Sequence, residues 1–421
     1  MKISFSRSTQ QFLLLSLASG ILLGCSFPPI PFGIIATVAF VPFLFLVERI
    51  RTYGSMFRYA YTTFFIFCLV SVYWVGGFTH HKDPYLMLAG GALLLWQPLF
   101  FCFPALIYFF IRRKIGLRWG IFSFPFVWIT FEWLYALGEF SFPWLTLGNT
   151  QTYALEKIQF IEYTGVYGLS LLLLIINILI FIALNPEWNF SLRKKFTLIG
   201  IATLLYVLPN FYGMMRHHAP EPSATRIKIG IVQPNTDPWE KWEGAGTLAG
   251  RWRLVQSYLP IFDQLKKDSA SIVVLPETAI LFDIPTHTEH YSLLKKFIDS
   301  LDISIVSGYV KTKYYYNNDA PAGSSLIKGT NIFYDSYNAV ICIQPNTETA
   351  QTYSKMRLVP FAERIPYADK VVFLIEPLRW GVGISNWGIG KDSTIFHHSA
   401  TNTNFLGMIC YESIFPEFVA N

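Results

Sequence analysis

Seven apolar runs fill the first half of the chain, and they constrain its fold more than any other feature. Most of them reach the roughly 20 residues that a helix needs to span a bilayer, whereas the first two are shorter and would suit a hairpin. A buried soluble core is the alternative, but seven runs within about 210 residues favour a membrane bundle. We therefore expect a transmembrane domain over residues 1–215. The runs lie at about 11–26, 31–47, 59–78, 85–111, 119–137, 165–184 and 196–213.

The basic residues between these runs predict how the domain is oriented. If the N-terminus is cytoplasmic, the inner loops hold twelve Lys and Arg residues and the outer loops hold two, Lys82 and Lys157. This asymmetry satisfies the positive-inside rule. An odd number of spans then places residues 216–421 on the outer side of the membrane. The twelve inner residues are Lys2, Arg7, Arg49, Arg51, Arg58, Arg112, Arg113, Lys114, Arg118, Arg193, Lys194 and Lys195.

Composition agrees with a membrane protein, since 52% of the residues are hydrophobic and 14% are charged, against about 25% charged in soluble domains. The net charge of +6 could suggest nucleic acid, but the basic residues lie between apolar runs and topology explains them better. We expect no nucleic-acid partner. The stretch Leu22–Cys25 is similar to a lipoprotein signal peptide, although the pattern continues through six more runs. No Cys or His spacing suggests a metal site.

The pattern changes at Arg226, where shorter strand-like runs begin to alternate with helical ones. Such alternation is typical of an α/β layered domain, which we expect over residues 216–421. The run Ser271–Leu275 is almost wholly apolar, as expected for a strand covered on both faces. The predicted helices are 247–267 and 289–300, and the predicted strands are 227–233, 271–275, 304–310, 339–343 and 405–409.

Three segments of this half carry residues suited to acyl transfer through a thioester. They contain Glu277, Lys355 and Cys410, each in or just after an apolar run. A Cys can attack a carbonyl, a Glu can take and return the proton, and a Lys can neutralise the oxyanion. Alone, each has an ordinary explanation: a loop charge, a surface ion pair, or a small buried side chain. We also expect the ammonium of Lys355 to lower the pKa of the Cys410 thiol.

Together these segments resemble the nitrilase superfamily, whose sites use Glu, Lys and Cys in that chain order. With the multi-span half, nearly the whole chain resembles one membrane-embedded branch, the bacterial apolipoprotein N-acyltransferases. The resemblance implies a multi-span α-helical bundle followed by an αββα sandwich. The motifs that carry it are Pro276-Glu277-Thr278, Lys355 with Leu358-Val359-Pro360-Phe361 and Glu363, Cys410-Tyr411-Glu412 with Phe415-Pro416, Phe142-Pro143-Trp144-Leu145 with Gly148 and Gln151, and Val232-Gln233-Pro234-Asn235 with Lys241-Trp242.

The resemblance also implies a reaction in the bacterial inner membrane, with the catalytic domain on the periplasmic side. Glu277 would be the general base, Lys355 the oxyanion stabiliser and Cys410 the nucleophile. Cys410 would take an acyl chain from a phospholipid, phosphatidylethanolamine being the expected donor. The N-terminal amine of a diacylglyceryl-cysteine apolipoprotein would then accept that chain. No metal or soluble cofactor is implied.

Further residues receive roles from the same resemblance. Glu363, Glu412 and Tyr411 would support the catalytic three. Asn338 and Trp242 match positions that line or shape the site. Trp144 lies in the stretch 138–164, which is either an aromatic belt at the membrane interface or a wall of the route by which lipid enters. We include it among the expected substrate-binding residues.

The sequence departs from the family at its end and at one position. The family continues with more of the sandwich and a last span, so we expect the domain over 216–421 to be incomplete at its C-terminal end, with an unpaired sheet edge. Residue 362 is Ala where Gly is expected.

Two other functions remain open. One is a membrane-tethered amidase, although a tether needs one span rather than seven. The other is a non-catalytic membrane protein, although the spans hold few ionisable residues, of which Glu132 is the clearest.

Overall fold

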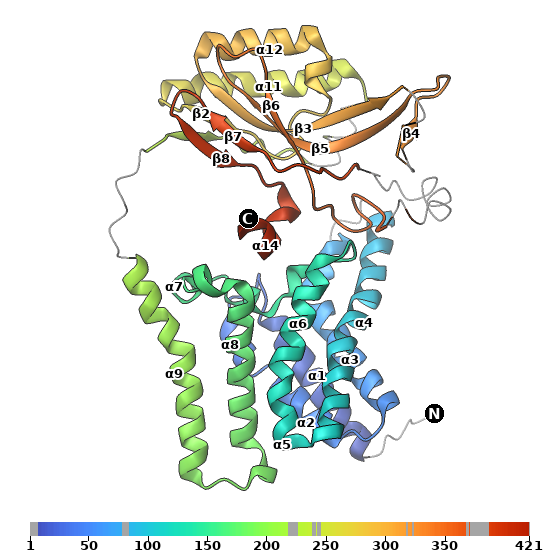
Figure 1. Cartoon of the computed structure of the whole chain (residues 1–421), viewed down its shortest axis with the longest axis vertical. Coiled ribbons are helices and arrows are strands. Elements are labelled where there is room, and N and C mark those ends of the chain that lie inside the picture. Colours follow the sequence, from blue (N-terminus) through green and yellow to red (C-terminus); the bar gives the residue numbers. More distant parts are fainter. Residues whose placement is uncertain are drawn as a thin grey trace. The chain divides into compact units, whose positions relative to one another are not determined.

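The computed structural model describes residues 7–77, 84–217, 226–237, 241, 246–316, 319–321, 324–367, 370 and 387–420. The chain forms two compact units, Met1–Pro220 and Glu221–Asn421, which are treated separately below. The first unit is helical and the second is built on a sheet (Figure 1). The boundary lies a few residues beyond the expected position at 215, because the last helix of the first unit runs to His217.

Six helices of the first unit are long and apolar enough to cross a membrane, among the residues that the structure describes. They correspond to six of the seven apolar runs, and the remaining run, 31–47, forms no spanning helix. The elements of this unit are α1 Arg7–Cys25, η1 Gly33–Thr37, α2 Val41–Arg49, α3 Tyr53–Val72, η2 Tyr73–Gly76, α4 Pro84–Ile115, α5 Leu117–Gly120, η3 Ile121–Ser123, α6 Phe124–Leu137, η4 Pro143–Leu145, η5 Leu147–Gln151, α7 Leu155–Ile158, α8 Ile161–Leu184, η6 Pro186–Trp188 and α9 Leu192–His217, where η marks a 3₁₀ helix.

The run 31–47 nevertheless carries the chain back across the bundle. Helices α1 and α3 run parallel, because Phe12 packs on Tyr59 near their starts and Gly24 lies against Val70 near their ends. Two parallel helices need a return crossing between them. The segment Gly33–Arg49, here called the broken segment, makes that crossing as a 3₁₀ turn followed by the nine-residue helix α2.

Asn177 of α8 satisfies the backbone where the broken segment is not helical. Its side chain is fully buried, donates to the carbonyl of Ala36 at 2.7 Å and accepts the N–H of Phe40 at 2.8 Å. Unpaired peptide groups at membrane depth are tolerated only where protein groups satisfy them. The prolines at 28, 29, 31 and 42 explain why a continuous helix does not form here.

The two ends of the broken segment are fastened by further polar contacts. At its start, the side-chain amide of Gln151 donates to the carbonyl of Gly33 at 2.6 Å. At its end, the amide of Asn185 donates to the Glu48 carboxylate at 2.9 and 3.0 Å, and Arg112 donates to the carbonyl of Glu48 at 2.7 Å. The segment is therefore fixed to α4 and α8 as an integral part of the bundle.

Glu132, the ionisable residue that the sequence singled out, is buried in α6 and holds the loop that follows. Its carboxylate accepts the indole N–H of Trp128 at 3.0 Å and the N–H of Leu147 at 2.8 Å. The hydroxyl of Ser170 accepts the N–H of Gly148 at 2.9 Å. These contacts fasten the loop that carries Trp144 to α6 and α8.

The second unit contains a six-stranded mixed sheet and a separate two-stranded one. The order in the large sheet is β1-β2-β3-β5-β4, with β6 also paired to β5; the first three strands are parallel and the remaining pairs are antiparallel. The elements are β1 Ile229–Ile231, α11 Leu248–Lys267, β2 Ile272–Val274, η7 Ile284–Thr286, α12 Thr288–Leu301, β3 Ser304–Tyr315, β4 Ser325–Leu326, β5 Phe333–Ile343, β6 Gln351–Ser354, β7 Ile395–His398, β8 Thr403–Leu406, η8 Cys410–Ile414 and α14 Pro416–Ala420.

The large sheet is covered on both faces, which explains its apolar strands. Helices α11 and α12 lie on one face and the β7–β8 hairpin lies on the other (Figure 1). Along β5, Ala339 and Ile341 enter the core beneath the helices, whereas Val340 and Cys342 enter the core shared with Phe396 of the hairpin. Because side chains alternate between faces, a strand between two layers is apolar at every position.

The structure corrects several predicted boundaries. Strands β3 and β5 are twelve and eleven residues long and pair along their whole length, whereas the prediction ended the first at 310 and began the second at 339. The strand predicted at 405–409 is β8, which ends at Leu406. Strands β4, β6 and β7 were not predicted.

Candidate active site

Glu277 lies on a tight turn that follows β2. The next residue, Thr278, has a left-handed backbone with φ of 49°. The turn packs on Gly308 of β3 so closely that a Cβ atom there would lie 2.7 Å from the Cα of Glu277 and 2.5 Å from the nitrogen of Thr278. Only glycine allows this approach, so Gly308 sets the position of the Glu277 turn.

Lys355 follows β6 and is completely buried, with its ammonium between two carboxylates. Its Nζ lies 2.8 Å from Oε1 of Glu363 and 3.6 Å from Oε1 of Glu277. A buried ammonium is tolerated only when it is paired. The two glutamates therefore fix the lysine side chain in place between them.

Asn338 connects the two carboxylates from the side of β5. Its amide donates to Oε1 of Glu277 at 2.5 Å and to Oε1 of Glu363 at 3.3 Å. The other oxygen of Glu363 accepts the N–H of Val359 at 2.8 Å. Asn338 thus touches the expected base directly.

Cys410 is the first residue of η8, and its backbone is left-handed with φ of 48°. The sequence placed it at the end of a strand, but three residues separate it from β8. A left-handed conformation is unfavourable for any residue with a Cβ atom and is concentrated at functional sites. The sharp turn leaves the Cys410 side chain exposed.

Glu412 joins the segment of Lys355 to the segment of Cys410. It is fully buried, and its carboxylate accepts the N–H of Met356 at 2.7 Å, the N–H of Ile409 at 2.8 Å and the hydroxyl of Tyr353. Burial and the bond to Glu412 raise the pKa of the Tyr353 hydroxyl, which therefore stays a donor. One carboxylate ties together the backbone that precedes Cys410 and the backbone that follows Lys355.

The pKa of the Cys410 thiol is raised overall, although Lys355 lowers it as predicted. Partial burial of the otherwise exposed side chain is the largest cause, followed by the negative charge of Glu277; Lys355 opposes them, while Glu363 and a hydrogen bond to Glu277 raise the pKa further. The two carboxylates together raise the pKa of the thiol more than the one ammonium lowers it. The resting site therefore holds a neutral thiol beside a carboxylate that can take its proton.

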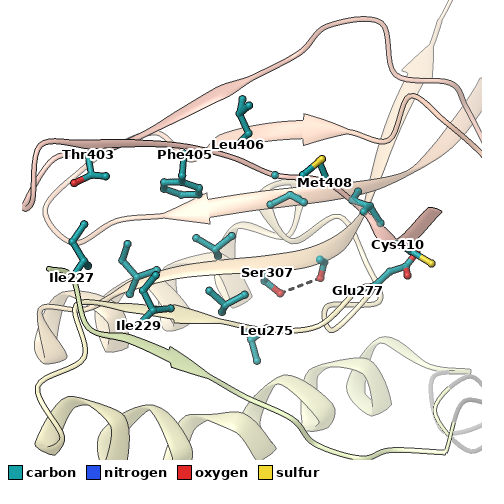
Figure 2. Close-up of a pocket in the computed structure, with 17 residues that line it drawn as sticks. Ile227, Ile229, Leu275, Glu277, Ser307, Thr403, Phe405, Leu406, Met408 and Cys410 are labelled. Atoms are coloured by element: carbon teal, nitrogen blue, oxygen red, sulfur yellow. Dashed lines mark hydrogen bonds between the residues drawn. The ribbon is translucent and has the colours of Figure 1, made fainter. Parts of the chain in front are cut away.

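An apolar hollow of about 370 Å³ adjoins this pair. Figure 2 shows Glu277 and Cys410 side by side at one end of it, while Ile227, Phe405 and Leu406 line the part further away. Apolar walls lower the local dielectric, which strengthens the interaction between charges. This environment accounts for the desolvation of the thiol.

The other expected site residues are placed as follows. Tyr411 is buried and packs edge-on against the ring of Phe415, 5.2 Å away. Trp144 belongs to the helical unit, where its ring lies 6.1 Å from that of Trp74. Trp242 lies outside the described residues. Among the residues that the structure describes, no three His, Cys, Asp or Glu side chains gather as metal ligands.

Two residues that shape the site were not predicted from the sequence to do so. Gly308 sits inside an apolar strand run, where an isolated glycine can signal a close backbone approach. Lys241 was noted only as part of a motif, yet its ammonium donates to the carbonyl of Glu277 at 3.1 Å and to the hydroxyl of Thr278 at 2.8 Å. No local pattern predicts that contact, because the partners lie 36 and 37 residues apart.

Comparison with known proteins matches both units to described families. Residues 19–179 match the apolipoprotein N-acyltransferase N-terminal domain, and residues 228–421 match the carbon-nitrogen hydrolase family. An apolipoprotein N-acyltransferase of Chlorobaculum tepidum is 30% identical over 423 aligned residues, which cover 98% of this chain and 77% of the relative. The chain belongs to the apolipoprotein N-acyltransferase family. It is accordingly a multi-pass membrane acyltransferase with a nitrilase-like domain.

More distant similarities add detail. The apolipoprotein N-acyltransferase of Geobacter metallireducens is 27% identical, over 96% of this chain and 73% of the relative. The chain thus spans about three quarters of the length of these two relatives. A solved glutamine-dependent NAD⁺ synthetase from Acinetobacter baumannii covers 40% of this chain at 15% identity and a TM-score of 0.25, too low to inform the fold.

Proposed function

We propose that the chain transfers an acyl chain from a phospholipid to the N-terminal amine of a diacylglyceryl-cysteine apolipoprotein, with Cys410 as the covalent carrier. The observation that carries this proposal is the contact between the Cys410 thiol and the Glu277 carboxylate, which itself lies 3.6 Å from the buried ammonium of Lys355. A nucleophile, a base and a cation for the oxyanion are thereby adjacent.

In the first half-reaction, Glu277 takes the proton of the Cys410 thiol as the sulfur attacks the ester carbonyl of the phospholipid. A C–S bond forms, and the carbonyl oxygen becomes an oxyanion that Lys355 stabilises. The C–O bond to the glycerol then breaks, and Glu277 returns the proton to the departing oxygen. The products are a lysophospholipid and a Cys410 thioester.

In the second half-reaction, the lipoprotein amine attacks the thioester carbonyl. Glu277 takes a proton from the amine nitrogen, the C–S bond breaks, and the proton passes to the departing sulfur. The products are an amide and the free thiol. The same carboxylate takes and returns a proton in both half-reactions. Its position therefore affects the rate of each of them.

The raised pKa of the thiol fits this sequence of steps. A thiol that stays protonated at rest is protected from oxidation and from stray electrophiles, which act on the thiolate. Glu277 removes the proton only when an acyl group is in place. Glu363 and Asn338 keep Glu277 and Lys355 aligned, and Glu412 and Tyr411 hold the turn that presents Cys410.

The helical unit in the same chain supports a lipid donor, and the family resemblance points to phosphatidylethanolamine. We assign Trp144, Asn338 and Trp242 to substrate binding, with Trp144 on the path of the lipid. An enzyme that draws its donor from the bilayer needs a catalytic domain fixed at the membrane surface, and six long apolar helices supply that attachment.

We further propose that the protein lies in the bacterial inner membrane with its catalytic unit on the periplasmic side. The twelve-to-two bias of basic residues supports a cytoplasmic N-terminus. The broken segment adds a seventh crossing to the six long helices, so the two ends of the helical unit would face opposite sides. Labelling of Ser223→Cys but not Ser191→Cys by an impermeant maleimide is the expected result. The reverse pattern contradicts the orientation.

Intact-protein mass spectrometry tests the covalent route. Incubation with phosphatidylethanolamine alone should add one acyl mass at Cys410, released by neutral hydroxylamine. Cys410→Ala should lose the adduct, and Cys410→Ser should fail nearly as completely, because a hydroxyl is much harder to deprotonate. Cys342→Ala is the matched control, since Cys342 is buried in the same unit and away from Glu277. Transfer to the lipoprotein amine by Cys410→Ala would rule out the thioester.

A further inference from the structure

Lys241 holds the turn that carries the expected base. Its ammonium donates to the carbonyl oxygen of Glu277 at 3.1 Å and to the hydroxyl of Thr278 at 2.8 Å. These two acceptors lie on either side of the Glu277–Thr278 peptide bond. The bonds therefore fix the plane of that peptide at the point where the chain enters the left-handed conformation of Thr278.

Two backbone bonds also restrain the turn, from the N–H of Ala279 to the carbonyl of Pro276 at 3.3 Å and from the N–H of Ile280 to the carbonyl of Gly308 at 3.1 Å. Gly308 contacts it from β3, and Asn338 reaches only the end of the Glu277 side chain. A left-handed threonine is strained, since its branched Cβ is crowded there. Without the two bonds from Lys241, the turn can relax, and the Glu277 carboxylate moves with it.

Lys241 is also electrostatically linked to Glu277. Burial lowers the pKa of its ammonium, and the attraction of the Glu277 carboxylate opposes that effect. The other charged groups around Glu277 are Lys355 and Glu363, and the Cys410 thiol faces it from η8. With Lys241 included, two cations balance two carboxylates at the site.

We propose that Lys241 is a positioning residue for acyl transfer, acting through Glu277 by holding the Glu277–Thr278 turn. The inference rests on the proposed role of Glu277 and Cys410. The contacts of the Lys241 ammonium are with the carbonyl of Glu277 and the hydroxyl of Thr278, and not with the thiol or the oxyanion. Its effect belongs to the rate of the chemical steps rather than to the binding of lipid.

The test uses the full-length protein in detergent and two acyl donors. The release of p-nitrophenol from p-nitrophenyl butyrate in a single burst reports Cys410 acylation without any phospholipid. Lys241→Met should slow the burst on the order of 10-fold to 100-fold, the scale expected when a reacting group is held less well. The KM for phosphatidylethanolamine should stay within about twofold of wild type, while kcat falls. Lys241→Arg should recover part of the rate because it keeps the charge and the donors.

Lys311→Met is the matched control. Lys311 donates to the hydroxyl of Thr352 at 3.2 Å in the same unit, so the same kind of bond is lost away from Glu277. It should keep the wild-type burst. A wild-type rate in Lys241→Met, a raised KM with unchanged kcat, or an equal loss in Lys311→Met would each overturn the proposal. If the wild-type protein gives the p-nitrophenol burst but transfers no acyl chain from phospholipid, the proposed donor is wrong. The effect of Lys241 on the burst can still be measured in that case.

If Lys241→Met does not fold, two changes at its partner decide the question. Thr278→Ala removes the accepting hydroxyl and leaves the lysine in place, whereas Thr278→Ser keeps the hydroxyl. We expect the alanine variant to slow the burst several-fold and the serine variant to stay near wild type. Equal rates in both variants would overturn the proposal.

Discussion

The two units bury polar groups in different ways. In the helical unit, neutral amides satisfy the interrupted backbone: Asn177 bonds to Ala36 and Phe40, and Gln151 bonds to Gly33. In the catalytic unit, a buried ammonium and two carboxylates face one another around Asn338. The first arrangement contributes to a crossing of the bundle, and the second is suited to moving a proton.

The difference shows which changes should affect stability and which should affect chemistry. Removing a buried amide that pairs with backbone groups leaves those groups unpaired. The removal should therefore lower the free energy of unfolding. The catalytic unit can lose one charged residue of its site and still fold, because the remaining residues keep partners on several strands. The electrostatic potential at the site will nevertheless change. Single substitutions in each arrangement should therefore separate effects on chemistry from effects on stability.

Lys355→Ala should slow formation of the Cys410 acyl adduct by ~10²–10³-fold, the usual cost of removing an oxyanion donor. The helical unit should keep its protease resistance. Single-turnover acylation followed by intact-protein mass spectrometry measures the rate, with Lys311→Ala as control. An acylation rate within threefold of wild type would remove Lys355 from the mechanism and weaken the contrast between the units.

Asn177→Leu should destabilise the helical unit by about 2–3 kcal/mol, because a carbonyl and an N–H lose their partner in the bundle interior. Thermal unfolding in detergent and trypsin resistance report the loss. Asn210→Leu is the control, since the bonds that Asn210 makes among the described residues go to carbonyls of its own helix, at positions 206 and 207. Equal effects of the two substitutions would show that the broken segment does not depend on Asn177.

Glu277→Gln should lower the pKa of Cys410, because it removes a negative charge next to the thiol. Acyl transfer should nevertheless become slower, since the base is lost. The pH dependence of Cys410 alkylation by iodoacetamide measures the first effect, and mass spectrometry measures the second. Glu289→Gln, at the start of α12, is the control. Faster alkylation together with faster transfer would contradict the role of Glu277 as a base.

His398 should give the smallest effect, a dependence of stability on pH. It is buried against Ser304 and Thr401, and burial, followed by the nearby His397, lowers its pKa. The unfolded chain therefore binds a proton near pH 6.5 while the folded unit does not. Stability is fully present above that pH and falls by about 1 kcal/mol or less as the pH drops through the folded pKa.

His398→Gln should flatten this dependence, whereas His397→Gln, which changes an exposed ring, should weaken it only partly, because His397 is the smaller of the two causes of the lowered pKa. Urea unfolding of the full-length protein at pH 5 and pH 7.5 compares the variants. An unchanged difference between the two pH values in His398→Gln would assign the dependence to other groups.

Much of the fold could be predicted because its signals are local. Six of the apolar runs became long helices, and the alternation after Arg226 indicated a layered α/β domain. The strand extensions of β3 and β5 were missed because residues such as Lys311, Thr312 and Asp335 are polar there. Their pairing comes from the partner strand and not from their own side chains.

The candidate catalytic residues could be chosen from their motifs, but the electrostatics around them and the side chains that support them could not be predicted. The pKa of Cys410 depends on how many carboxylates approach the sulfur, which one sequence cannot count. The run 31–47 was counted among the seven apolar runs, yet its prolines and the partner Asn177 make it an interrupted crossing rather than one long helix. The role of Glu412 in joining two loops likewise depends on contacts between residues far apart in the chain.

The left-handed backbone of Cys410 has a consequence for how the protein can change over time. A glycine would adopt that conformation with less strain, so Cys410→Gly should relax the turn, and under the proposed mechanism it should also end catalysis. Backbone strain at this position therefore favours glycine, and under the proposed mechanism only selection for activity keeps a cysteine there. A copy of the gene released from that selection should accept glycine at residue 410 without losing its fold.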